Sequence, residues 1–386
     1  MSLPNATIIA GIPARNFALY HAIRFSAGDP AAFIETPGSN GRPTRTLIIR
    51  DIEMGRARKH AKADRVACPA DFAPEGGLAG DRETATAQAA AECLVRAGVR
   101  TVRADRTLPL IFAETIRAAG IAVELDPDLG VSDRRRKDER EVDAMRAAQA
   151  MTESAVRMAC ETIARAAAAR DGTLMHGGEP LTAERLRFMI DVYLLERNYE
   201  NAPAIVACGP EGEDCHNLGR GPLRTGQPII VDVFPRDRAT LYCGDCTRTV
   251  VHGDAPDWLV AMHAAVVQAK AAGTAAIRAG AAGEAAYQAC LAAIQRAGWD
   301  RSLLAPEAPE GFCSLQHGLG HGVGLEVHEP PLLDLGGPVL VAGDAVTVEP
   351  GLYAKGRGGV RIEDVVIVRE NGCENLGTLP EGLCWR

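Results

Sequence analysis

The chain has 386 residues, of which 47% are hydrophobic and 24% are charged, a length and composition that allow two globular domains with a large buried core. Its formal net charge of −8 argues against a nucleic-acid partner, because binding to phosphate groups favours a basic surface. Residues 1–16 lack the pattern of a signal peptide, and no apolar run approaches the ~20 residues of a membrane span, so we expect a cytoplasmic protein without a membrane partner.

The first third of the sequence, residues 1–132, alternates strand-like runs with helix-like stretches, which is typical of a three-layer α/β domain. The expected strands include Thr7–Ile9, Thr46–Ile49 and Ala122–Leu125, and the expected helices include Arg82–Ala97 and Pro109–Ala119. This region has no glycine-rich phosphate loop and no cluster of metal ligands, and its His21 and His60 are isolated. A charged run at residues 132–137 predicts a linker to a second domain, residues 133–386.

The second domain carries an internal repeat. Each half is expected to contain a long helix, a second helix, a strand and then a β-hairpin. In the first half these elements are Glu139–Ala169, Leu181–Arg197, Asn201–Cys208 and Pro228–Val251. In the second half the helices are Pro256–Ala279 and Gly283–Ala297, and the hairpin is Asp344–Val368. Two such units related by pseudo-symmetry would bring their hairpins together over one central site.

Both hairpins carry one acid on each arm. In the first hairpin, a turn centred between residues 238 and 239 would place Asp232 directly opposite Asp245. In the second hairpin, Glu349 and Glu363 occupy matching positions on the two arms. Carboxylates that face each other on a buried surface repel unless a cation lies between them. The first hairpin alone could expose its acids to solvent, but the second copy favours a cation site.

A glycine- and histidine-rich segment, HGLGHGVGLEVHEPP, lies between the hairpins and contains His317, His321 and His328. Four carboxylates and an imidazole suit two borderline-hard divalent ions better than a soft thiolate site does. Cys243 and Cys246 form a CxxC pair that could bind zinc or act in redox chemistry. Since no second pair accompanies it, and the eleven cysteines show no disulfide spacing, we favour a packing role in a reducing compartment.

These separated motifs, in this order, resemble the ligand set of the pita-bread metallopeptidases (family M24), which include methionine aminopeptidase, aminopeptidase P, prolidase and the metal-free creatinase. The resemblance covers about the last two thirds of the chain, and its first hairpin is two residues longer than in familiar members. The preceding region resembles the N-terminal domain of creatinase, aminopeptidase P and prolidase. The implied fold class is α+β, with a three-layer α/β domain before a pita-bread domain.

The resemblance implies a dinuclear metal site. Asp245 and Glu363 would bridge two divalent ions, Asp232 would bind one of them, and His321 with Glu349 would complete the other. The ions would activate a shared hydroxide, and Glu349 would also relay a proton to the leaving nitrogen. Manganese is our first choice of metal, with cobalt, zinc or iron as alternatives.

Four further residues are expected beside the metals. His317 and His328 resemble the carbonyl-stabilising and substrate-orienting histidines of the family. His216 resembles a further substrate-side histidine, with a polar loop residue as the alternative. Arg361 is expected to orient a ligand carboxylate or the substrate terminus, with a surface position on a strand as the alternative.

The complete ligand set argues against creatinase, and the N-terminal domain argues against methionine aminopeptidase. What remains is hydrolysis of the Xaa-Pro bond of a small peptide, by a dipeptidase (prolidase) or by aminopeptidase P, in an expected homodimer. Lys355 and Arg357, near the tip of the second hairpin, could pair with the carboxylate of a dipeptide and so favour the dipeptidase, or could be solvated turn residues. Hydrolysis of a non-peptide amide and a silent binding protein remain alternatives.

Overall fold

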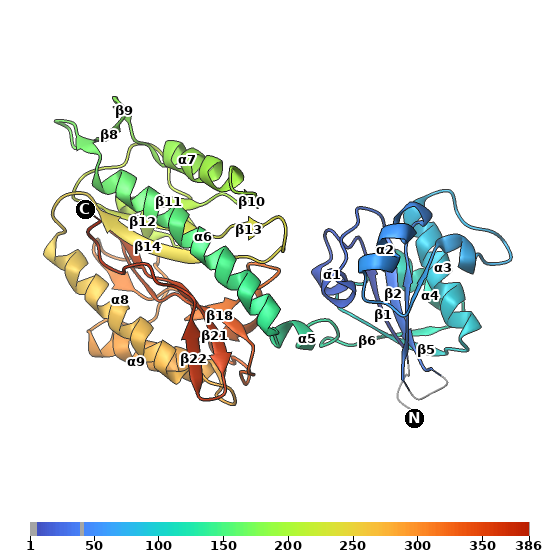
Figure 1. Cartoon of the computed structure of the whole chain (residues 1–386). Helices are drawn as coiled ribbons and strands as arrows, with labels where there is room; N and C mark the ends of the chain where they lie inside the picture. Colours follow the sequence, from blue (N-terminus) through green and yellow to red (C-terminus); the bar gives the residue numbers. More distant parts are fainter. Residues whose placement is uncertain (1–5, 39–41, 386) are drawn as a thin grey trace. The chain divides into compact units, whose positions relative to one another are not determined.

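The computed structural model describes residues 6–38 and 42–385. The chain divides into two compact units, Met1–Arg134 and Arg135–Arg386, and Figure 1 shows both. Residues 1–5, on which part of the expectation about a signal peptide rests, lie outside the described residues. Within the described ranges, every helix is too short or too polar to cross a membrane.

The first unit is built on one six-stranded sheet in the order β4-β3-β2-β1-β5-β6. Its strands are β1 (Ala6–Gly11), β2 (Ala31–Thr36), β3 (Thr44–Ile48), β4 (Arg65–Ala67), β5 (Thr101–Ala104) and β6 (Ala122–Leu125). Its helices are α1 (Phe17–Ile23), α2 (Met54–His60), α3 (Arg82–Arg96) and α4 (Leu110–Ala118), and the short α5 (Ser132–Arg135) follows them. The strands and helices predicted in this region are confirmed to within two residues at each end.

Both faces of this sheet are covered by helices. Because successive side chains of a strand point to opposite faces, the neighbours Ile8 and Ile9 enter different hydrophobic clusters. Ile8 packs with Leu94 and Phe112 of α3 and α4, whereas Ile9 packs with Leu19 of α1. The predicted three-layer α/β arrangement is therefore confirmed for this unit.

The second unit contains the repeat that the sequence predicts. Its helices are α6 (Glu139–Ala164), α7 (Ala183–Leu195), α8 (Asp257–Ala276) and α9 (Gly283–Arg296). α6 and α7 share one hydrophobic cluster with the first hairpin, and α8 and α9 share another with the second hairpin. α6 ends five residues before the predicted Ala169, because β7 (Ala167–Ala168) pairs with β8 (Leu174–His176) and this pairing overrides the helix propensity of an alanine run.

The two halves form sheets of matching order, β11-β12-β14 in the first and β16-β18-β21 in the second. The first consists of β11 (Ile205–Cys208), β12 (Pro228–Val233) and β14 (Cys246–Val251). The second consists of β16 (Gly320–Gly322), β18 (Ala345–Val348) and β21 (Asp364–Arg369), extended by β17 (Glu329–Leu333) and β22 (Gly372–Asn375). The short remaining strands are β9 (Glu179–Pro180), β10 (Tyr199–Glu200), β13 (Arg236–Asp237), β15 (Cys313–Ser314), β19 (Gly351–Ala354) and β20 (Gly358–Arg361). In Figure 1, the yellow strands β12 and β14 are arms of the first hairpin, and the orange-red strands β18 and β21 are arms of the second.

The register predicted for the first hairpin is wrong. Asp232 pairs with Thr247 rather than with Asp245, because the connection between the arms is not a tight turn. It contains β13, which pairs with β10, and it turns at Leu241, whose φ is 66°. Since the shift is two residues, Asp245 stays on the same face as Asp232, and the convergence of the two acids survives the error.

The second hairpin keeps one register along its whole length. Val348 pairs with Asp364 and Gly351 pairs with Arg361, so Glu349 and Glu363 come to directly opposite positions between the two ladders. The turn lies at Gly356, where φ is 70° and a glycine avoids the steric penalty of the left-handed region. The predicted placement of these two acids around this turn is confirmed.

Arg248 of β14 links the hairpins to the last part of the chain. Its side chain is fully buried, with a relative exposure of 0%. The guanidinium donates to the carbonyl oxygens of Glu363 (2.6 Å), Leu379 (2.7 Å) and Pro380 (2.9 Å), and it forms an ion pair with Asp364 at 2.7 Å. A buried cation with this many acceptors fixes the segment around residue 380 against both hairpins.

Candidate metal centre

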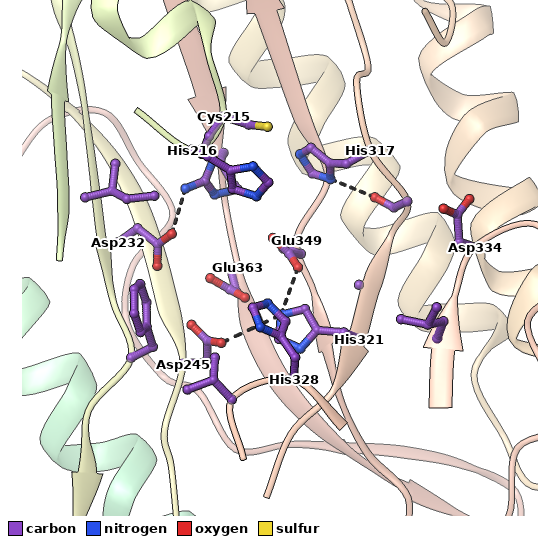
Figure 2. Close-up of a pocket in the computed structure, with 17 residues that line it drawn as sticks. Cys215, His216, Asp232, Asp245, His317, His321, His328, Asp334, Glu349 and Glu363 are labelled. Atoms are coloured by element: carbon purple, nitrogen blue, oxygen red, sulfur yellow. Dashed lines mark hydrogen bonds and ion pairs between the residues drawn. The ribbon is translucent and has the colours of Figure 1, made fainter. Parts of the chain in front are cut away.

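A pocket of about 310 Å³ opens between the two hairpins of the second unit. It is lined by all nine residues that the sequence singles out: His216, Asp232, Asp245, His317, His321, His328, Glu349, Arg361 and Glu363. Figure 2 shows Asp232, Asp245, Glu349 and Glu363 around His321, with His216 and His317 on the side away from Asp245 and with Asp334 apart from the other acids. Residues up to 147 positions apart in the chain therefore meet in one cavity, as the repeat predicts.

The acidic floor has the character of a cation site. Ligand atoms of Asp245, His321 and Glu363 lie within 4.8 Å of one another. Asp232 accepts a hydrogen bond from Arg361 through Oδ2 at 2.7 Å, while its buried Oδ1 has no hydrogen-bond partner among the described residues. A buried carboxylate oxygen without a donor is costly, and a metal ion would satisfy it.

The electrostatics of the floor point the same way. Burial raises the pKa of Asp245 and Glu363, and the other carboxylates of the pocket raise both values further by repulsion. Burial also raises the pKa of Glu349, although nearby His317 and Arg361 oppose the shift. A divalent cation among these oxygens would relieve the repulsion, so the residues present fit the metal pair that the resemblance implies.

His321 is oriented as a metal ligand. Its Nδ1 lies 3.1 Å from the carbonyl oxygen of Gly322, and since a carbonyl only accepts, Nδ1 carries the proton. The lone pair of Nε2 then faces the acids, 3.3 Å from Oε1 of Glu349 and 3.9 Å from Oδ2 of Asp245. Burial lowers the pKa of His321, which favours the neutral imidazole that a metal requires.

Two supporting residues were missed by the sequence analysis. Thr247 donates from Oγ1 to Oε2 of Glu363 at 2.6 Å, and Gln149 holds both the backbone N–H (3.0 Å) and the carbonyl (2.9 Å) of Asp245. Thr247 could have been found, because it lies two residues after Asp245 on the same face of β14. Gln149 leaves no such signal, since it is one polar residue in a long helix of the other layer.

A buried chain of hydrogen bonds connects Asp232 with His317. Arg361 donates to Asp232 and also, through Nη1, to the hydroxyl of Tyr353 at 2.9 Å. That hydroxyl lies 2.7 Å from Nε2 of His317, whose Nδ1 is 2.9 Å from the carbonyl of Gly318. Since Nδ1 donates to Gly318, Tyr353 must donate to Nε2, and His317 is held through both ring nitrogens. Tyr353 was not singled out from the sequence.

His328 and His216 border the floor from two sides. The ring of His328 contacts that of His321 edge-on, with the centroids 4.2 Å apart, and its side chain is exposed towards the pocket. Burial lowers the pKa of His328, as does the neighbouring His321 ring. His216 follows the 3₁₀ turn Gly209–Glu213 and reaches the pocket from the first half of the repeat.

The pocket does not contain the two cations considered for binding a substrate carboxylate. Nζ of Lys355 lies 3.3 Å from the carbonyl oxygen of Ala305, and the guanidinium of Arg357 lies 5.8 Å from the ring centre of Trp258. Neither residue lines the pocket. The reason is geometric: five residues of extended strand from the pocket floor carry the hairpin tip about 16 Å away. Their alternative interpretation, as turn residues, agrees with this placement.

A second acidic cluster, formed by Glu153, Cys246 and Asp364, lies behind the pocket. Asp364 pairs there with Arg248 at 2.7 Å and with Lys270, so cationic side chains already neutralise this cluster. Cys246 and Cys243 are both buried and not disulfide-bonded, and burial raises the pKa of Cys243 to about 11. Thiols protonated in this way are poor metal ligands, in keeping with a packing role.

A carboxylate-rich site between two pseudo-symmetric hairpins defines a metallohydrolase centre of the pita-bread fold. The chain belongs to metallopeptidase family M24, whose model matches residues 143–370. A curated relative from Mycobacterium tuberculosis (strain ATCC 25618 / H37Rv), "Probable dipeptidase PepE", is 36% identical over 196 residues, which are 50% of this chain and 48% of that protein. The chain thus spans about half the length of the curated relatives that it matches at this level.

Two further similarities cover more of the chain. The "Xaa-Pro dipeptidase" of Pyrococcus horikoshii is 26% identical over 286 residues, 72% of this chain and 73% of that protein. Among solved structures, the prolidase from Pyrococcus horikoshii OT3 has a TM-score of 0.75 at 21% identity, covering 98% of this chain and 95% of that one. The X-Pro aminopeptidase from Thermotoga maritima MSB8 has a TM-score of 0.77 at 22% identity, covering 98% and 96%. At these identities the two structures establish the fold, including the N-terminal unit.

Proposed function

We propose that the protein hydrolyses the Xaa-Pro bond of small peptides with two divalent metal ions, as a dipeptidase (prolidase) or as aminopeptidase P. The observation that carries the proposal is the convergence of Asp232, Asp245, His321, Glu349 and Glu363 in one pocket, with a buried Asp232 oxygen that has no donor among the described residues. Relatives named dipeptidase and Xaa-Pro dipeptidase support the substrate class. The similar solved structures include both a prolidase and an X-Pro aminopeptidase, so the substrate length stays open.

The metal ligands are proposed as follows. Asp245 and Glu363 would hold both ions, Asp232 would hold one of them, and His321 with Glu349 would hold the other. When bound, two divalent ions polarise the scissile carbonyl and lower the pKa of a shared water to about 7. Manganese is the proposed metal, because carboxylate-rich sites with one imidazole suit it.

The protein side chains supply proton transfer and orientation. Burial raises the pKa of Glu349, so its carboxyl can hold a proton closer to neutral pH than an exposed glutamate and pass it to the leaving nitrogen. His328, exposed towards the pocket beside His321, is placed to donate to the carbonyl oxygen. We assign His317 and His216 to the substrate side of the pocket, and Arg361 to holding Asp232.

The proline itself fits this chemistry. A bond before proline is a tertiary amide without an N–H, so a protease that depends on that donor binds it poorly. A site that acts on the carbonyl oxygen and on a protonatable leaving nitrogen does not need the donor. The M24 site therefore offers a route to a bond that general proteases avoid.

The test is metal content and turnover on a short panel. Protein loaded with manganese, cobalt, zinc or iron is assayed with Xaa-Pro dipeptides, matched Xaa-Ala dipeptides and Xaa-Pro tetrapeptides. We expect hydrolysis of the proline substrates with two ions bound for each chain. Since one relative is named simply a probable dipeptidase, equal hydrolysis of Xaa-Ala dipeptides would support a dipeptidase without proline preference. No hydrolysis with either class would overturn the proposal. Sedimentation of the same samples tests the proposed homodimer.

A further inference from the structure

Two ion pairs anchor residues 135–137, with which the second unit begins. Arg135 contacts Asp344 through two hydrogen bonds, from Nε at 2.9 Å and from Nη2 at 2.7 Å. Nζ of Lys137 lies 2.6 Å from Oε1 of Glu329, and each of these two side chains is only 2% exposed. Removing two charges from water this completely costs several kcal/mol for each ion, so the Lys137–Glu329 pair is a weak source of stability.

The Lys137–Glu329 pair lies directly behind the pocket wall. Glu329 is the first residue of β17, and its neighbour His328 is the histidine that borders the metal ligands. Successive side chains along an extended chain point to opposite sides. Accordingly, Glu329 is buried and does not line the pocket, whereas His328 is exposed towards it. The position of the Glu329 carboxylate therefore influences the position of the neighbouring His328 side chain in the pocket.

The loop before β17 is shaped around the same pair. A methyl group on Gly324 would lie 2.6 Å from Oε1 of Glu329 and 3.1 Å from Cε of Lys137, so a larger residue there would displace the pair. The carbonyl of Gly324 accepts a hydrogen bond from the backbone of Cys243 at 2.8 Å, which ties the loop to the approach to β14. The segment carrying His328 is thus held from behind by one charged contact and from the side by the first hairpin.

We propose that Lys137 is a positioning residue for His328 and acts through Glu329. The inference rests on the proposed function, in which His328 meets the substrate carbonyl. Without the ammonium group, the Glu329 carboxylate would lose the 2.6 Å contact that fixes its position, and the adjacent His328 would move with it. Lys137 touches neither the substrate nor the metals, so its loss should leave both able to bind.

The Arg135–Asp344 pair provides a matched control. It starts from the same segment and its Asp344 is fully buried, but it ends at the turn before β18 rather than beside His328. The experiment compares the double variants Lys137→Met/Glu329→Gln and Arg135→Met/Asp344→Asn in the metal-loaded protein, since each removes both charges of one pair. We expect the first to lower kcat on an Xaa-Pro dipeptide about 10-fold with KM nearly unchanged, because misplacing a catalytic group by a fraction of an ångström has effects of this order. The second should stay within about twofold of the parent kcat, and both should bind the parent amount of metal.

Two further variants guard against a folding defect. Lys137→Arg keeps the cation and should therefore have a kcat close to that of the parent, unlike Lys137→Met/Glu329→Gln. Gly324→Ala leaves both charges in place but displaces the carboxylate of Glu329, and it should lower kcat without changing metal content. Parent kcat in both Lys137→Met/Glu329→Gln and Gly324→Ala, or an equal loss in Arg135→Met/Asp344→Asn, would overturn the inference.

A readout that does not depend on activity separates this inference from the proposed function. In zinc-loaded protein, the ring resonance of His328 is assigned in the NMR spectrum by its disappearance in His328→Asn. It should shift in Lys137→Met/Glu329→Gln and stay in place in Arg135→Met/Asp344→Asn. An unchanged His328 resonance in both would reject the positioning role. Failure of the parent to cleave Xaa-Pro peptides, with the resonance shift present, would reject only the proposed function.

Discussion

At the scale of single residues, the most informative atom in the molecule is Oδ1 of Asp232. The other oxygen of this carboxylate, Oδ2, accepts a hydrogen bond from Arg361 at 2.7 Å. Oδ1, in contrast, is buried without a hydrogen-bond donor in the described structure. Buried polar atoms in folded proteins almost always have a hydrogen-bond partner, a bound water or an ion. Together with the crowded Asp245 and Glu363, this oxygen marks the floor of the pocket as a place for cations.

Removing a proposed bridging ligand should dismantle the site. We expect Asp245→Ala and Glu363→Ala each to reduce the bound metal from two ions towards one or none and to abolish peptidase activity, because each side chain would contact both ions. Elemental analysis and turnover on an Xaa-Pro dipeptide measure the two effects. Two tightly bound ions and full activity in both variants would remove these residues from the site.

The histidines should separate into two groups. Substituting His328 or His317 by Ala should lower kcat by about 10²-fold or more and leave metal content near that of the parent, since neither is placed as a ligand. His321→Ala should instead lose metal first, because its Nε2 faces the acids. The same metal analysis and kinetics on all three variants provide the check. Metal loss in step with activity loss at His328 would mean that it is a ligand.

At the scale of elements, the main feature is that two hairpins each place carboxylates on the buried floor of one pocket. Because Asp245 and Glu363 have folded-state pKa values above those of unfolded chains, the metal-free protein binds more protons folded than unfolded. Its stability therefore falls as the pH rises through the unfolded pKa of about 4 towards the raised folded values. The proposed metal ions, bound in place of the protons, would restore that stability.

This linkage predicts proton release on metal binding. When the metal-free protein is titrated with Mn²⁺ or Zn²⁺ near neutral pH, the carboxyls that still hold protons must give them up, and the apparent affinity should fall as the pH is lowered. Calorimetric titrations in two buffers with different ionisation enthalpies give the number of protons released. Identical heats in the two buffers would show that the acids are already fully ionised and that the predicted shifts are wrong.

The sequence allowed the elements and the face of each acid to be predicted, but not every contact between them. A register shift of two residues leaves Asp232 and Asp245 on one face, whereas a shift of one would have separated them, which is why the pocket could be predicted although their register was wrong by two residues. Glu349 and Glu363 were placed correctly because their hairpin closes at one glycine. Gln149, Tyr353 and Lys137 could not be assigned, because their roles depend on which distant layer each side chain faces.

At the scale of the whole molecule, the remaining question is substrate length. Since Lys355 and Arg357 lie away from the pocket, we expect the double variant Lys355→Ala/Arg357→Ala to leave the ratio of kcat/KM for a dipeptide to that for a longer peptide within about twofold of the parent value, as surface substitutions far from a site do. Steady-state kinetics on both substrates measure this ratio. A large fall for the dipeptide alone would bring these cations back into substrate recognition.

The parent protein itself should prefer the shorter substrate. The relatives named dipeptidase and Xaa-Pro dipeptidase motivate the expectation that kcat/KM for an Xaa-Pro dipeptide exceeds that for the same sequence extended by two residues. Competition between the two peptides in one reaction, followed by chromatography, gives the ratio of the kcat/KM values directly. A clear preference for the longer peptide would assign the protein as an aminopeptidase P.

The contacts of Arg248 impose an order of events on synthesis of the protein. Asp232 and Asp245 emerge from the ribosome well before Glu363, and the carbonyls of Leu379 and Pro380 that complete the surroundings of Arg248 emerge later still. A nascent chain that stops between Glu363 and Leu379 has every proposed metal ligand and still leaves a buried guanidinium without two of its acceptors. We therefore expect that the proposed metal ions can be held only after the segment around residue 380 has been synthesised and has packed against Arg248.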